Sequence, residues 1–160
     1  MGYSVRLADR NDLPRILDIY EIARNFMAKN GNPTQWAGGY PAESLLEGDI
    51  LAGNLYVVTD DQQIAGVFCF VLGEDPTYKI IEDGSWRSNS PYGTIHRIAS
   101  DGHGVFAAAL TFCKGKIDHI RIDTHHNNMP MQHLIEKHGF SHRGIIYVAD
   151  GTPRIAFDMV

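Results

Sequence analysis

A turn with two glycines, placed between a strand and a helix, is the part of this sequence best suited to bind a phosphate group. Thr94–Ala99 predicts the strand, Ser100–Gly104 the turn and Val105–Cys113 an apolar helix. The first N–H groups of a helix have no partner inside it, its dipole favours negative charge, and glycine allows a ligand to approach the backbone. The same pattern also fits an ordinary strand–turn–helix unit without a ligand, so both interpretations stay open here.

Several side chains could accept or donate a proton in catalysis. His96 lies on the predicted strand, and imidazole changes its charge close to neutral pH. Since successive strand residues point to opposite faces of a sheet, we expect His96 and Arg97 to point in opposite directions. A histidine that only makes a hydrogen bond within the sheet is the alternative. Further candidates for proton transfer are the acids Glu74, Asp75 and Asp123.

Aromatic residues on irregular segments are candidates for the wall of a ligand pocket. The segments Asn32–Pro41 and Asp83–Gly93 contain glycine and proline, which argue against a helix or a central strand. Loops held by a rigid scaffold often carry binding residues, although a tryptophan can also plug the edge of a core. The candidates are Trp36 and Tyr40 in the first segment and Trp86 and Tyr92 in the second.

Composition and cysteine usage exclude several classes of protein. The net charge of -5 gives no basic field for nucleic acid, and no apolar run approaches the roughly 20 residues that span a bilayer. Cys69 and Cys113 lie in apolar segments, which indicates reduced core residues and a cytoplasmic protein. No metal is expected, because His125, His126 and His133 match no common zinc spacing.

The hydrophobic pattern predicts one α+β, or mixed α/β, domain over residues 1–160. The expected order is β-α-α-β-β-β-α-β-α-β-β, with a mostly antiparallel sheet of six to seven strands flanked by helices. A helix capped by Asn11 or Asp12 should end near Gly31, and Gly66 should mark a bulge or a close approach. The remaining expected strands are Ser4–Ala8, Leu55–Thr59, Ile64–Leu72, His119–Asp123, Arg143–Val148 and Arg154–Met159, and Ala42–Glu47 is a short helix.

One motif resembles a known family. Asn128-x-x-Met131-x-x-Leu134-Ile135-Glu136-Lys137-His138-Gly139-Phe140 is similar to the Asn-x-x-Ala-x-x-Leu-Tyr-Glu-Lys-x-Gly-Phe ending of the GNAT superfamily of N-acetyltransferases. The usual Gln/Arg-x-x-Gly-x-Gly/Ala loop is degenerate. With Gly102 and Gly104 as its glycines its first position is Ala99, and with Gly104 as the first glycine Phe106 takes the small-residue place. The family's frequent tyrosine acid falls on Ile135.

The resemblance implies transfer of an acetyl group from acetyl-CoA to a primary amine of a small molecule or a peptide. In this family, backbone groups of the strand before the loop bind pantetheine and polarise the acetyl carbonyl, which here points to Ile98 and Ala99. The loop and the following helix start bind the pyrophosphate. The expected acetyl-CoA contacts are Ile98, Ala99, Ser100, Gly102, His103, Gly104, Val105, Phe106, Asn128 and Met131.

The roles at the acceptor side stay open. The catalytic candidates are His96, Glu74 and Tyr147. The acid lost at Ile135 is replaced by Tyr147 or, as alternatives, by Tyr78 or Tyr92. A GNAT-like module that binds acyl-CoA without efficient transfer is one alternative, and another phosphate-binding α/β domain is a second. A homodimer and a monomer both stay open. The expected acceptor contacts are Trp36, Tyr40, Asp75, Tyr78, Trp86 and Tyr92.

Overall fold

The computed structural model describes residues 2–102 and 104–160. Its strands form a seven-stranded sheet in the order β1-β2-β3-β4-β5-β7-β6. The pairs β1·β2, β2·β3, β5·β7 and β6·β7 are antiparallel, and β4·β5 is parallel. The predicted α+β fold with a mostly antiparallel sheet is therefore confirmed. The chain forms two compact units, Met1–Phe70 with His96–Phe112 and Val71–Ile95 with Cys113–Val160.

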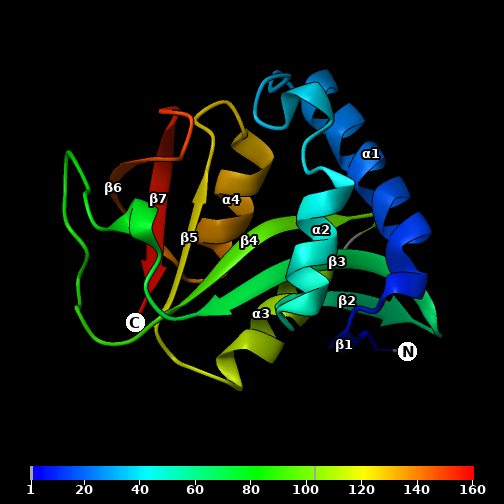
Figure 1. Ribbon diagram of the computed structural model, residues 1–160. Helices are drawn as coiled ribbons and strands as arrows, with labels where there is room; N and C mark the ends of the chain where they lie inside the picture. The colour runs from blue at the N-terminus through cyan, green and yellow to red at the C-terminus, as the bar shows by residue number, and fades with distance from the viewer. Residues whose placement is uncertain (1, 103) are drawn as a thin grey trace. The chain divides into compact units, whose positions relative to one another are not determined.

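The first unit contains the N-terminal strands and helices. Figure 1 shows α1 and α2 side by side over the strands β2 and β3. Its elements are β1 (Ser4–Leu7), α1 (Leu13–Lys29), α2 (Glu43–Leu51), β2 (Leu55–Asp60), most of β3 (Gln63–Leu72), and the larger parts of β4 (Gly93–Ser100) and α3 (Val105–Lys114).

Helix α3 packs on one face of β2 and β3. Tyr56 and Phe68 are register partners on these strands, and Phe112 of α3 lies with its ring centroid 4.9 Å from that of Tyr56 and 6.3 Å from that of Phe68. A Cβ at Gly66 would collide with the Val105 side chain. The close approach predicted at Gly66 is therefore confirmed, because only a glycine lets the start of α3 come this near to β3.

Two local features differ from the predictions. Asp12, one of the two predicted capping residues, is the N-cap residue of α1, but its side chain makes no capping bond to that helix. The side-chain cap lies at Asp9, which accepts from the Asn11 N–H at the start of a short 3-10 helix, Arg10–Asp12, that precedes α1. The Asp9 N–H in turn donates to Asp12 Oδ2 at 2.8 Å, so the pair forms a capping box. The loop Asn32–Pro41 also contains a short 3-10 turn at Ala37–Gly39.

The second unit holds the C-terminal strands. Its elements are β5 (Ile120–Thr124), α4 (Met129–Lys137), β6 (Ser141–Tyr147), β7 (Pro153–Met159) and a 3-10 turn at Pro76–Tyr78. Strand β7 lies between β5 and β6. Ile120, Ile135, Ile146 and Phe157 are almost fully buried and form part of its interior.

Candidate functional site

The predicted phosphate-binding turn leads directly into the start of α3. The Asp101 N–H donates to Ala65 O at 2.8 Å, and Ser100 Oγ donates to Gly102 O at 3.1 Å. The Ala108 N–H donates to Gly104 O at 3.2 Å as the first bond of α3. The N–H groups of residues 105–107 therefore precede the first bond of the helix, as an anion site at a helix start requires.

Gly104 allows the positive φ with which the backbone passes from this turn into α3. Its φ is 86°, and a Cβ there would lie 3.0 Å from the Tyr3 ring. Val105 and Phe106 are buried, so the bulky side chain at the degenerate loop position packs into the protein. Arg15 forms a 2.8 Å ion pair with Asp101, which offsets the negative charge beside the turn. His103 lies outside the described residues.

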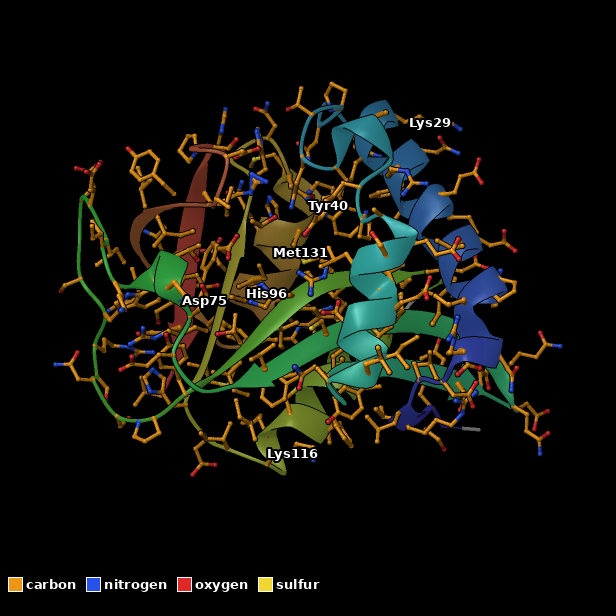
Figure 2. The ribbon with its side chains drawn as sticks, in the orientation of Figure 1. Lys29, Tyr40, Asp75, His96, Lys116 and Met131 are labelled. Carbon is orange, nitrogen blue, oxygen red and sulfur yellow. The ribbon has the colours of Figure 1, made fainter. Side chains whose placement is uncertain are left out.

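Strand β4 is distorted at Arg97, whose φ is 52°. The expectation that the side chains of His96 and Arg97 point in opposite directions assumed a regular strand. This assumption is wrong, because the left-handed conformation of Arg97 breaks the alternation. His96 is half-buried on β4, where Figure 2 labels it. The side chains of Ile98 and Ala99 are buried, so only the backbone of these two residues is suited to contact a ligand.

A network of polar and aromatic side chains surrounds Arg97 in the first unit. Its Nη2 forms a 2.7 Å ion pair with Asp49 of α2, and its carbonyl accepts a 2.7 Å hydrogen bond from the Tyr20 hydroxyl of α1. Trp36 is buried with its ring centroid 5.4 Å from that of Tyr20 and 6.4 Å from that of Tyr40. Tyr40, labelled in Figure 2, is 38% exposed, so of the two aromatics predicted here it is the one that solvent reaches.

The aromatics of the second unit pack around an arginine that the sequence did not single out. Arg121 of β5 is 4% exposed, and its guanidinium lies 4.0 Å from the Trp86 ring centroid and 3.9 Å from that of Tyr92. Trp86 Nε1 donates to Tyr78 O at 2.9 Å. These contacts give Tyr78, Trp86 and Tyr92 structural partners, and their role at the acceptor stays a prediction. The sequence offered one signal of this buried cation, an arginine between two isoleucines on a predicted strand.

The acidic candidates have different surroundings. Glu74 is exposed, whereas Asp75 is half-buried. Asp75 Oδ1 accepts from the Thr77 N–H at 2.9 Å and from the Thr77 hydroxyl at 2.7 Å, which caps the turn at Pro76–Tyr78. Figure 2 labels Asp75 at this turn. Asp123 of β5 accepts a 2.6 Å hydrogen bond from the buried Tyr78 hydroxyl, whose pKa is raised by burial and by that carboxylate.

The predicted acid Tyr147 lies at the end of the edge strand β6. Its hydroxyl donates to Glu82 Oε1 at 2.9 Å, and this bond raises the pKa of Tyr147. Strand β7 separates β6 from β5. The role of Tyr147 as the acid stays a prediction.

The family motif at α4 is a helix start. Asn128 Oδ1 accepts from the Met131 N–H at 3.2 Å, so the asparagine caps the helix. Met131 is half-buried, and Figure 2 labels it on α4. Ile135 is fully buried, consistent with a core residue where the family often has a tyrosine.

Across residues 2–102 and 104–160, no group of three or more His, Cys, Asp or Glu side chains is arranged to hold a metal ion. Within the same residues, no helix combines the length and the apolar character needed to cross a membrane.

Solved structures match this chain over its whole length. A GNAT-family acetyltransferase from Streptococcus agalactiae is 32% identical, with a TM-score of 0.91, 100% of this chain and 96% of that chain covered. One from Listeria monocytogenes is 18% identical, with a TM-score of 0.69 and coverage of 98% and 95%. AAC(6')-Ib, solved with ribostamycin and coenzyme A, is 15% identical, with a TM-score of 0.67 and coverage of 100% and 94%. The last two show a shared fold alone. No family model and no curated protein sequence matches the chain.

Proposed function

This chain belongs to the GNAT family of acetyltransferases, and we propose that it transfers the acetyl group of acetyl-CoA to a primary amine of a small molecule or a peptide. The observation that carries the proposal is the 32% identity to an acetyltransferase over all of this chain. The same coverage supports one catalytic domain over residues 1–160. The aminoglycoside in the AAC(6')-Ib structure does not choose the acceptor here, because 15% identity relates the folds alone.

The turn and the start of α3 are the proposed pyrophosphate site. Backbone N–H groups at the helix start and the positive φ of Gly104 support this placement. Residues 98–100 of β4 would offer backbone groups to the pantetheine and the acetyl carbonyl. Asn128 and Met131 remain proposed contacts from the family motif, with Asn128 also serving as a helix cap.

The chemistry required of the protein is modest because a thioester is already activated. The amine must be held against the acetyl carbonyl, lose a proton, and form the amide bond as the carbon–sulfur bond breaks. A backbone N–H beside the carbonyl would stabilise the negative charge that develops on its oxygen. The departing sulfur leaves as a thiolate that takes a proton from water or from a side chain.

His96 is the proposed general base, acting directly or through a water molecule. It lies on β4 immediately before the distorted residue Arg97. Glu74, Asp75 and Asp123 are the other proposed acceptors of the amine proton. Two of the proposed acceptor contacts, Trp36 and Tyr40, lie in the first unit. Tyr40 is the more exposed of the two, which favours it as a contact for a ligand from solution.

A second candidate function is acyl-CoA binding without efficient transfer. The degenerate glycine loop and the buried Ile135 favour it. Isothermal titration with acetyl-CoA and with free nucleotides separates both CoA functions from a general phosphate site. Release of free CoA thiol with a panel of amines then separates transfer from binding.

The cellular location is proposed from the cysteines. Cys69 and Cys113 are both buried and free. Reduced buried thiols are typical of a protein made for the cytoplasm. Fractionation of the source cells, followed by detection of the protein, tests this proposal, and recovery outside the cytoplasm would contradict it.

A further inference from the structure

The centre of β4 adopts a backbone conformation that its own sequence does not favour. Arg97 has a φ of 52°, which a residue with a Cβ rarely adopts. Other non-glycine residues with positive φ, such as Asp61 and Gln62, lie in a hairpin turn, where this conformation is common. Arg97 lies inside a strand, so neighbouring groups must hold it there.

The backbone of Arg97 is held from α1. Its carbonyl oxygen accepts a 2.7 Å hydrogen bond from the hydroxyl of Tyr20. Tyr20 is fully buried, and burial raises the pKa of this hydroxyl well above its usual value. The hydroxyl therefore keeps its proton and remains a donor throughout the neutral pH range.

The side chain of Arg97 is held from α2. Its Nη2 lies 2.7 Å from Asp49 Oδ2, and the two side chains are only 15% and 14% exposed. Burial raises the pKa of the neighbouring Cys69 thiol to about 12, so this thiol carries no charge at neutral pH. Asp49 is thus the carboxylate that balances the arginine in this partly buried place.

We propose that Tyr20, Arg97 and Asp49 form a clamp that fixes the distorted centre of β4 in the geometry needed for acetyl transfer. The inference rests on the proposed function, because Arg97 directly precedes the backbone of Ile98 and Ala99 that would meet the acetyl group. The three are positioning residues, since they act through the strand rather than on the acetyl group. Misplacement of a reacting group by about 1 Å can cost on the order of a hundredfold in rate.

Tyr20→Phe tests the backbone part of the clamp. The variant keeps the ring and removes the hydroxyl, and we expect kcat to fall about tenfold while the dissociation constant of CoA changes by less than about twofold. Thr59→Val is the matched control, because it also removes a hydroxyl that donates to a backbone carbonyl, that of Ser4, elsewhere in the same unit. The control should keep the parent kcat.

Substitutions of Arg97 separate backbone strain from the ion pair. Arg97→Ala and Arg97→Gly both delete the guanidinium, but glycine adopts a φ of 52° without strain. We expect the kcat of the glycine variant to be higher than that of the alanine variant by a factor of about five or more. A purely structural ion pair predicts equal or lower activity for glycine, and that result would overturn the proposal.

A double variant tests the side-chain part. Asp49→Asn leaves a partly buried arginine without its carboxylate, so we expect a lower kcat and a lower melting temperature in the parent background. In the Arg97→Gly background the same change has no charge to unbalance, and both losses should disappear. Persistence of the kcat loss in that background would contradict the clamp.

A measurement without turnover keeps the clamp separate from the proposed function. Amide hydrogen exchange of β4 should be faster in Tyr20→Phe than in both the parent and Thr59→Val. If exchange changes in this way but the parent transfers no acetyl group to any amine, the clamp stands as a structural device. Its role in acetyl transfer is then refuted. Unchanged exchange of β4 together with an unchanged kcat in Tyr20→Phe refutes the clamp itself.

Discussion

The hydroxyl of Tyr78 donates a 2.6 Å hydrogen bond to the carboxylate of Asp123. Tyr78 is 2% exposed and belongs to the turn after β3, whereas Asp123 lies on β5. The bond therefore ties a turn to a strand within the second unit. Since the acceptor is a carboxylate and the donor is buried, this bond should contribute more than an ordinary surface hydrogen bond.

We expect Tyr78→Phe to lower the free energy of unfolding by about 1.5–3 kcal/mol, because it deletes a buried hydrogen bond to a charged group. Tyr147→Phe is the matched control, since it removes a hydroxyl that donates to a carboxylate, Glu82, at the exposed surface. That control should unfold as the parent does. Urea denaturation of the three proteins measures the effect, and equal stabilities for all three would contradict it.

The buried tyrosines predict a loss of stability at alkaline pH. Burial raises the pKa of Tyr20 and of Tyr78 well above the unfolded value of about 10. The folded protein keeps these protons while the unfolded chain releases them, so their stabilisation is complete below about pH 10 and falls as the pH rises above it.

Tyr78→Phe should reduce this alkaline slope by about 1.4 kcal/mol per pH unit, the share of one proton. Unfolding free energies measured at several values above about pH 10, for the parent and the variant, check the difference. Parallel slopes would show that Tyr78 titrates in the folded protein much as it does in the unfolded chain.

Charge at the proposed pyrophosphate site is tested with two substitutions of Gly104. Both Gly104→Ala and Gly104→Asp strain a backbone with a φ of 86° and approach the Tyr3 ring, but only the second adds a negative charge. We expect CoA to bind about tenfold more weakly to the aspartate variant than to the alanine variant. Equal affinities, measured by titration on folded variants, would mean that the pyrophosphate does not bind at this turn.

His96→Gln tests the proposed base. Glutamine keeps hydrogen-bonding capacity but cannot take up a proton, so turnover with a good amine should fall about a hundredfold to ten-thousandfold. The dissociation constant of acetyl-CoA should stay nearly unchanged. His133→Gln, on the exposed face of α4, is the control and should keep the parent rate. A loss below about tenfold at His96 would assign the proton transfer to another group.

Much of the fold could be predicted from periodicity because alternation and helical spacing report burial directly. Gly66 was readable as a close approach since a glycine in an apolar strand has few other uses. The distortion at Arg97 could not be predicted, because it depends on Tyr20 and Asp49, which are distant in sequence. For the same reason, the packing of Trp86 and Tyr92 around Arg121 was hidden, and aromatics that looked available on a loop have a structural partner.

The measurement that tests the central claim most directly is release of free CoA thiol when the protein meets acetyl-CoA and a panel of amines. Burial raises the pKa of Cys69 and of Cys113 to about 12, so at neutral pH neither should react with the thiol reagent. The proposed function predicts thiol release that depends on the amine, matched by an equal amount of acetylated product. Tight binding of acetyl-CoA with no release for any amine would contradict acetyl transfer and favour the binding module, and failure to bind acetyl-CoA would contradict both.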